Sequence, residues 1–222
     1  MFTHLDIPPL PVVTDEMTAG GKRYYLTPEG NKYPSVTTML GHKEKPWLED
    51  WRNSLGPKKA DKETKRCSER GTAIHELAEK YLNNEPYPEF TKGYKQEYIG
   101  GFNKFKFELN HVNNIRTQEA ALYSDVLGLA GRVDCIAEYK GTLCIVDFKT
   151  SNNNKTNDMI YDYYLQTTAY AIMWHEMTNE AIEDITIIMS VEKGIMPLVF
   201  RDKIDKYVEP LLNRISEYRK AA

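Results

Sequence analysis

Residues 145–151, IVDFKTS, place an aspartate and a lysine at the end of an apolar stretch. Side chains alternate along a β-strand, so Asp147 and Lys149 are expected on the same face, about 7 Å apart. Charged groups taken out of water are costly unless they are paired or bind a metal ion. The pattern therefore indicates either a structural ion pair or an active site.

Two further acids come into line with Asp147 when the neighbouring hairpins are traced. The segment YKGT predicts a two-residue turn with Gly141 at its second central position, where positive φ is required. This register opposes Asp134 to Asp147, with Cβ atoms about 5 Å apart. The preceding loop around DVLG opposes Glu119 to Asp134. Arg132 is assigned to the opposite face of its strand, outside this row.

The three acids point to divalent-metal chemistry. Like charges that face each other across strands destabilise a sheet, and a cation relieves the repulsion. Mg²⁺ and Mn²⁺ prefer carboxylate oxygens, so Glu119, Asp134 and Asp147 form a candidate metal site. Two alternatives remain open: Lys149 pairs with one acid in a purely structural bridge, or a bulge in either hairpin shifts the register.

Hydrophobic period and turn residues predict the elements that position these side chains. The expected strands cover residues 115–125, 129–140, 142–151, 184–194 and 195–200, and the expected helices cover 58–83, 91–110, 159–177 and the C-terminus. Strands that are apolar on both faces suit the centre of a sheet covered by helices. The predicted fold class is α/β, with a central mixed β-sheet flanked by helices and an N-terminal helical extension.

Residues 1–222 are expected to form a single domain. An extended proline-rich start, a hairpin around PEGN and short helices make up an N-terminal arm over residues 1–57. The remaining residues, 58–222, carry the strands and long helices of the expected core. One substantial core is within reach of a chain of this length.

Composition excludes several classes of protein. The net charge of −3 gives no overall basic character, so a nucleic-acid partner requires local positive charge or divalent metal. No apolar run approaches the ~18 residues of a membrane span, so no membrane partner is expected. The three cysteines have no CxxC spacing, which argues against a zinc site. The N-terminus lacks a basic region, so neither a secretory signal nor a transit peptide is expected, and the predicted location is the cytoplasm.

Four short motifs carry a resemblance to a known family. GRVD (131–134) followed by DFK (147–149) resembles the PD-(D/E)XK nuclease signature, and QTTAY (166–170) is similar to the QxxxY element of RecB-like nucleases. GTAIHELAE (71–79) resembles the helix that supplies their metal-binding histidine. The likeness is closest to exonucleases of mitochondrial genome maintenance and related phage exonucleases, and it spans residues 33–170. One departure is that no proline precedes the first acid of the signature.

The resemblance implies a restriction-endonuclease-like PD-(D/E)XK core and a metal-dependent nuclease. Asp134 and Asp147 would be catalytic and would bind Mg²⁺ or Mn²⁺, with His75 and Glu119 as further metal ligands. Lys149 would orient the attacking water or neutralise charge on the phosphate. The alternatives are an exposed helix histidine and a solvated strand acid at the last two ligand positions.

The resemblance also implies residues that act beside the metal. Gln166 and Tyr170 are four apart on one helical face and would be catalytic through the lysine and the DNA; a core aromatic is the alternative for Tyr170. Ser35 and Thr37 would approach a DNA phosphate, although a helix cap explains them equally well. Arg70 ends a basic stretch that either follows the phosphate backbone or forms a solvated helix face.

The expected function is a metal-dependent DNA exonuclease that acts at strand ends and leaves 5′-phosphates, in replication, recombination or repair in a phage or bacterium. The resemblance favours single-stranded DNA or strand ends, and the fifteen tyrosines would suit base stacking, which tolerates any sequence. A monomer is the expected state. The alternatives are a duplex-end recombination exonuclease of the phage lambda type and a non-catalytic nucleic-acid-binding module. No iron–sulfur cluster is expected, because relatives that hold one need four cysteines.

Overall fold

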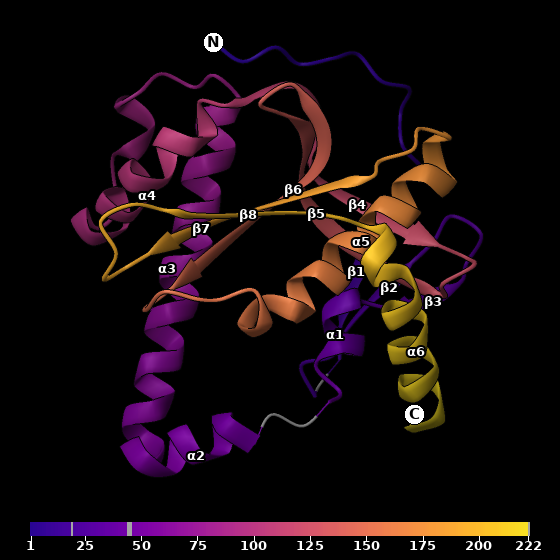
Figure 1. Ribbon diagram of the computed structural model, residues 1–222, viewed down its shortest axis with the longest axis horizontal. Coiled ribbons are helices and arrows are strands. Elements are labelled where there is room, and N and C mark those ends of the chain that lie inside the picture. Colours follow the sequence, from indigo (N-terminus) through magenta and orange to yellow (C-terminus); the bar gives the residue numbers. More distant parts are fainter. Residues whose placement is uncertain (19, 44–45, 222) are drawn as a thin grey trace.

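The computed structural model describes residues 1–18, 20–43 and 46–221 (Figure 1). In chain order, its elements are β1 (Thr14–Met17), β2 (Arg23–Leu26), β3 (Lys32–Pro34), α1 (Val36–Leu40), α2 (Pro46–Leu55), α3 (Pro57–Leu82), η1 (Glu89–Thr91), α4 (Gln96–Leu109), β4 (Val112–Ser124), β5 (Leu129–Tyr139), β6 (Thr142–Ser151), η2 (Asp158–Ile160), α5 (Tyr161–Thr178), β7 (Asp184–Val191), β8 (Leu198–Lys203) and α6 (Asp205–Ala221). None of the described helices is long and apolar enough to cross a membrane.

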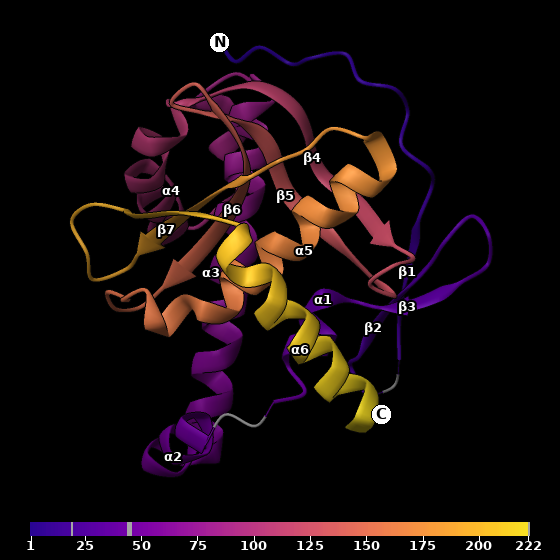
Figure 2. The ribbon, with the colours of Figure 1, turned by 45° about the vertical axis from the view of Figure 1, so that its right-hand side comes forward.

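The central sheet has five strands in the order β4-β5-β6-β7-β8. Strands β6 and β7 are parallel, because α5 connects them as a crossover, and the other neighbours are antiparallel. Helices α3 and α4 lie on one side of this sheet, and α5 and α6 lie on the other (Figures 1 and 2). The expected mixed sheet flanked by helices is confirmed.

The N-terminal extension contains more than the expected helices. Strands β1, β2 and β3 form a separate three-stranded sheet, in which β2 and β3 are the predicted hairpin. Strand β1 was not predicted, because TDEM is four residues long and has no apolar alternation from which to recognise a strand. The arm thus begins with a small sheet, and α1 and α2 follow.

Two apolar clusters fill the spaces on either side of the central sheet. One joins α1, α5 and α6 to the sheet face that carries Ile145, and the other joins α3 and α4 to the face that carries Val146 and Phe148. Strand β6 is therefore buried on both faces, which explains why its sequence is a near-continuous apolar run. Asp147, which lies within this strand, is accordingly buried.

The hairpin between β5 and β6 has the predicted register. Pairing runs from Tyr139–Thr142 to Cys135–Val146, across a turn in which Lys140 and Gly141 both have positive φ. Pairing ends there, one position before Asp134 and Asp147.

Beyond this point the two strands separate. Strand β5 continues beside β4, while β6 continues beside β7 as far as Ser151. The sheet therefore forks between β5 and β6, and Asp134 and Asp147 lie just inside the opening.

Helix α3 delivers its side chains to this fork. It begins at Pro57, where the missing N–H costs no helical hydrogen bond, and its 26 residues make it about 39 Å long. Its lower half projects past the sheet and carries α2 at its end (Figure 2). A Cβ built on Gly71 would lie 3.4 Å from Thr150 Oγ1, so glycine lets the helix approach the end of β6 closely.

Candidate active site

A cavity of about 580 Å³ opens at the fork in the sheet. The predicted site residues that line it are Ser35, Thr37, His75, Glu119, Asp134, Lys149, Gln166 and Tyr170. They come from the arm, from α3, from three strands of the sheet and from α5. Sequence segments more than 100 residues apart thus meet in one cavity, as the motif set predicted. Two predicted residues, Asp147 and Arg70, do not line it.

Three side chains in this cavity lie close enough to share one metal ion. His75 from α3, Glu119 from β4 and Asp134 from β5 each offer one ligand atom, and these atoms all lie within 4.8 Å of one another. The closest histidine and aspartate atoms, His75 Nδ1 and Asp134 Oδ1, are 3.7 Å apart. Asp147 is not part of this cluster, so the structure brings together three of the four predicted ligands.

The protonation chemistry of the cluster fits a divalent cation. Burial lowers the pKa of His75, which keeps the imidazole in the neutral form that binds metals. Burial, with the nearby charges of Asp134 and Glu79, raises the pKa of Glu119 to about 7. A cation would relieve this repulsion, and a set of one imidazole and two carboxylates suits Mn²⁺ or Mg²⁺.

Asp147 lies beneath the cavity and forms an ion pair with Lys149. Its side chain is almost fully buried, and Lys149 Nζ lies 2.5 Å from Oδ2. Burial raises the pKa of Asp147, and the lysine opposes this rise. Burial alone would lower the pKa of Lys149, but Asp147 and Asp134 outweigh it, and the pKa is raised. Oδ2 of Asp147 is taken by the lysine, whereas the buried Oδ1 has no hydrogen-bond partner among the described residues.

An aromatic ring that the sequence analysis did not select covers this lysine. Nζ of Lys149 lies 5.0 Å from the centroid of the Tyr163 ring, in the arrangement of a cation–π contact. Tyr163 is three residues before Gln166 and seven before Tyr170, so all three share one face of α5. The spacing of Tyr163 from Gln166 and Tyr170 could therefore have identified it from the sequence as a residue of the site.

Asp134 has a second contact that explains the fork. Its Oδ2 accepts a hydrogen bond of 2.7 Å from the backbone N–H of Phe148. The carboxylate thus takes a β6 backbone donor at the place where pairing between β5 and β6 ends. The expected direct opposition of the two aspartates is replaced by this side-chain contact, and Asp134 Oδ1 faces His75.

Glu119 and Arg132 show how β4 and β5 are shaped here. Pairing between these strands keeps the predicted register on both sides of Glu119, but Glu119 itself has φ +49°. Arg132 Nη1 donates a 2.6 Å hydrogen bond to the Glu119 carbonyl oxygen. The assignment of Arg132 to the opposite face was wrong, because residues two apart on a strand share a face, and Arg132 lines the cavity with Asp134.

Gln166 and Tyr170 form a hydrogen-bonded pair at the back of the cavity. Gln166 Nε2 donates to Tyr170 Oη at 3.0 Å, and burial raises the pKa of Tyr170. A Cβ built on Gly131 would lie 2.7 Å from Tyr170 Cε1. Gly131 therefore leaves the room that the Tyr170 ring needs against β5, because any side chain at position 131 would collide with this ring.

We expect Gly131→Ala to destabilise the protein by about 1–3 kcal/mol, the usual cost of overpacking a filled site. Urea unfolding measures the change. In a Tyr170→Leu background, the added methyl group meets no ring, so the extra cost should nearly vanish in a double-mutant cycle. Equal costs in the two backgrounds would show that the tyrosine does not impose the glycine.

Comparison with known proteins agrees with this geometry. A family model described as the PD-(D/E)XK nuclease superfamily matches residues 50–196, which include the fork and all three residues of the metal cluster. The chain belongs to the PD-(D/E)XK nuclease superfamily. The predicted fold class and family are confirmed.

Two relatives of this PD-(D/E)XK chain are mitochondrial genome maintenance exonuclease 1 from different mammals. The chain is 30% identical over 151 residues to mitochondrial genome maintenance exonuclease 1 of Mus musculus, which is 63% of this chain and 44% of the relative. The human protein of that name is 28% identical over 184 residues, which is 78% of this chain and 50% of the relative. The chain therefore spans about half the length of the curated relatives it matches.

The arm residues of this PD-(D/E)XK chain have mainly structural contacts. Ser35 is the N-cap of α1, and its buried hydroxyl oxygen accepts a 2.9 Å hydrogen bond from the Thr38 N–H. Thr37 is exposed, and its hydroxyl lies 2.9 Å from that of Ser35. The helix-cap alternative therefore holds for Ser35, whereas Thr37 presents its side chain to the cavity.

Arg70 does not lie where DNA binding would require it. It is 5% exposed, its Nη1 pairs with Glu192, and its Nη2 donates a 2.7 Å hydrogen bond to Asn152 Oδ1. The physical reason is helical phase: five residues before His75 correspond to about 140° around α3, away from the cavity. The expected DNA contact is thus corrected to a buried link between α3 and the ends of β6 and β7.

Metal binding in this PD-(D/E)XK site should depend on pH. The raised pKa of Glu119, about 7, means that the metal-free folded state holds a proton that the unfolded state releases near pH 4.5. Stability of the metal-free protein should therefore fall as pH rises through this window. A cation binds the deprotonated carboxylate, so Mn²⁺ should raise the melting temperature more at pH 8 than at pH 5.5.

Thermal melting after EDTA treatment, with and without Mn²⁺, measures this difference. In Glu119→Gln, whose side chain does not titrate, the metal-induced shift should depend less on pH. A shift of equal size at both pH values in the wild type would contradict the assignment of Glu119 to the metal cluster.

Proposed function

We propose that this chain is a metal-dependent DNA exonuclease that hydrolyses phosphodiester bonds from strand ends. The single observation that carries the proposal is the convergence of His75, Glu119 and Asp134 beside the ion-paired Lys149, in one cavity of a PD-(D/E)XK chain. A binding module would gain nothing from partly buried acids that lie close together, because their repulsion costs stability. A catalyst needs them to hold a cation.

His75, Glu119 and Asp134 would hold the cation, and Asp147 would join them through Oδ1, the oxygen that Lys149 does not pair with. When bound, a divalent cation polarises the scissile phosphate and lowers the pKa of the attacking water. The remaining chemistry belongs to side chains. The ammonium group of Lys149 would stabilise the charge that grows on the phosphate oxygens as the water attacks.

Gln166, Tyr170 and Tyr163 would act as positioning residues. The first two are linked by a hydrogen bond, and the ring of Tyr163 lies over the ammonium group of Lys149. This cover limits the directions in which the lysine can turn. Holding a catalytic group in one orientation saves entropy that a mobile group would lose in the transition state.

Single-stranded DNA is the substrate that we propose. Aromatic side chains bind bases regardless of sequence, and nine of the chain's 15 tyrosines are not buried. We further propose that residues 1–222 act as one unit and as a monomer, in the cytoplasm of a bacterium or of a phage-infected cell. Replication, recombination or repair would be the setting.

The experiment is an end-labelled nuclease assay. Single- and double-stranded oligonucleotides, labelled at either end, are incubated with the protein and Mg²⁺, Mn²⁺ or EDTA. Stepwise shortening that needs metal and favours single strands supports the proposal. Preference for duplex ends would favour a recombination exonuclease of the lambda type, and metal-independent binding without cleavage would favour the binding module.

A further inference from the structure

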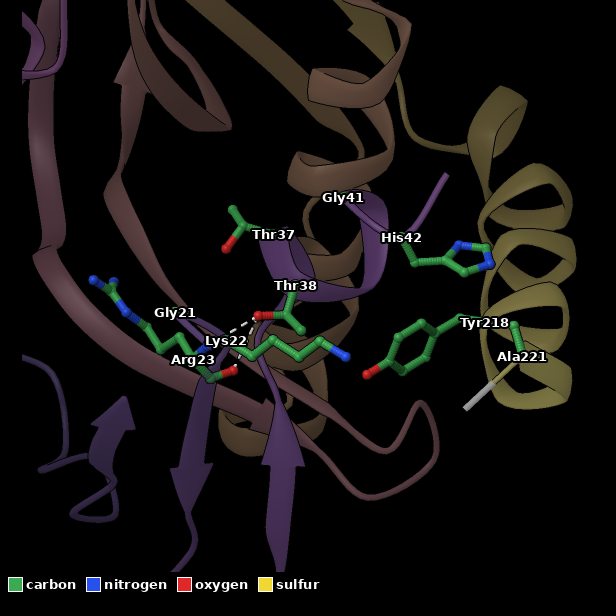
Figure 3. Close-up of a pocket in the computed structure, with 9 residues that line it drawn as sticks. All are labelled: Gly21, Lys22, Arg23, Thr37, Thr38, Gly41, His42, Tyr218 and Ala221. Atoms are coloured by element: carbon green, nitrogen blue, oxygen red, sulfur yellow. Dashed lines mark hydrogen bonds between the residues drawn. The ribbon is translucent and has the colours of Figure 1, made fainter. Parts of the chain in front are cut away.

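A second cavity, of about 610 Å³, adjoins the candidate active site (Figure 3). It lies between the β2–β3 sheet, α1 and the end of α6. Two residues, Arg23 and Thr37, line both cavities, so the two spaces meet at this pair of side chains. A chain-like ligand that leaves the active site on this side passes directly into the second cavity.

The charges of the two cavities differ. The described residues that line the active-site cavity include the acids Asp15, Glu76, Glu79, Glu119 and Asp134. Those that line the second cavity include Lys22 and Arg23, and none of them is aspartate or glutamate. The second cavity is therefore suited to an anion, whereas the first is suited to a cation.

The cations of the second cavity are weakly compensated. In the described part of the chain, no carboxylate lies within ion-pair distance of the exposed Lys22. The Lys22 side chain extends across the cavity toward the Tyr218 ring (Figure 3). Arg23 Nε is 3.9 Å from Asp15, at the limit of an ion pair, and its side chain is 43% exposed. Both groups can therefore bind a further anion at little cost.

His42 lines the same wall with its imidazole ring. Its ring nitrogens lie on the side of the ring away from Lys22, and Nδ1 is buried (Figure 3). The imidazole packs edge-to-face on the ring of Tyr218, with centroids 5.6 Å apart. This contact fixes both rings on the side of the cavity that faces Lys22 (Figure 3).

We infer that this second cavity binds a backbone phosphate of the nucleic-acid strand whose scissile bond lies in the adjoining active site. Lys22 would contact the phosphate, and Arg23 and Thr37 would flank the strand where the two cavities meet. The inference rests on the proposed function, which supplies the strand. The phosphate contacts would hold the strand on the side of the arm and of α6. A free phosphate ion shares this chemistry, and the test below separates the two sources.

The test measures binding without cleavage. Fluorescence anisotropy of a labelled single-stranded oligonucleotide is recorded in EDTA for wild type, Lys22→Ala and the control Lys92→Ala, which removes an exposed lysine outside both cavities. Loss of one phosphate contact should weaken binding by roughly three- to tenfold and reduce the slope of log affinity against log salt by about 0.7. The control should match wild type. Because Lys22 is exposed, its replacement should leave the melting temperature unchanged.

The outcomes separate this inference from the proposed function. If wild type cleaves DNA but Lys22→Ala keeps wild-type affinity and salt slope, the second cavity does not bind the strand. If Lys22→Ala weakens binding while wild type never cleaves, the phosphate site stands and the exonuclease proposal fails. Inorganic phosphate is titrated as well: if it binds wild type but not Lys22→Ala, and strand affinity is equal in both, the cavity holds free phosphate and the inference is overturned.

Discussion

Replacing Lys149 by alanine should slow phosphodiester cleavage by about a hundred- to a thousandfold, the usual effect of removing one preorganised charge from an active site. The ammonium group is ion-paired with Asp147 and lies under the ring of Tyr163, a position that the other cations lining the cavity, Arg23 and Arg132, do not occupy. DNA affinity should change little, because one side chain among many contacts is removed. The rate constant, not the Michaelis constant, should carry the loss.

Single-turnover cleavage of an end-labelled oligonucleotide, beside anisotropy in EDTA, measures the two effects separately. Lys140→Ala is the matched control, because Lys140 lies at the exposed tip of the same hairpin. The melting temperature of Lys149→Ala should fall as well, because the buried carboxylate of Asp147 loses its partner. The fall should be limited, because the raised pKa of Asp147 allows its carboxyl group to take up a proton. Cleavage at the wild-type rate would remove Lys149 from the mechanism.

Asp134→Asn should abolish both metal binding and cleavage while the fold persists. The asparagine oxygen can still accept the hydrogen bond from the Phe148 N–H, so the β6 backbone keeps its partner. The negative charge that would hold the cation beside His75 and Glu119 is lost. We expect a rate loss of about a thousandfold or more, since the metal supplies several kcal/mol of transition-state stabilisation.

Two measurements identify the cause of this loss. Mn²⁺ should raise the melting temperature of wild type but not of Asp134→Asn, and the metal-free melting temperatures should be similar. Asp61→Asn is the control, because Asp61 lies on the outer part of α3, where it pairs with Arg52 at the surface. Full thermal stabilisation of Asp134→Asn by Mn²⁺ would mean that the cation binds elsewhere.

Turn residues and strand alternation were enough to predict the β5–β6 hairpin and its register. The register on both sides of the Lys140–Gly141 turn was predictable, because turn type fixes how two strands pair. The fork was not predictable, because it arises where β5 and β6 take different neighbours, and strand partners are chosen by tertiary packing.

The predicted site residues show a similar division. His75, Glu119 and Asp134 were found because residue type and motif spacing reflect chemistry directly. Arg70 was misplaced because a basic stretch does not reveal which face of a helix meets the core. Arg132 was excluded by a miscount of strand alternation, although the sequence alone contained the correct answer.

The fork also has a mechanical meaning. Beyond the fork, strands β4 and β5 form one group and β6, β7 and β8 form another. The hydrogen bond between the Phe148 N–H and Asp134 links the two groups beside the opening. Glu119 and Asp134 lie on the first group of strands and Lys149 on the second. A small sliding of one group of strands against the other would change the distance between Asp134 and Lys149 without unfolding either group. Substitutions at the paired positions of β5 and β6 nearer the Lys140–Gly141 turn could tune this spacing while leaving Asp134 and Lys149 in place.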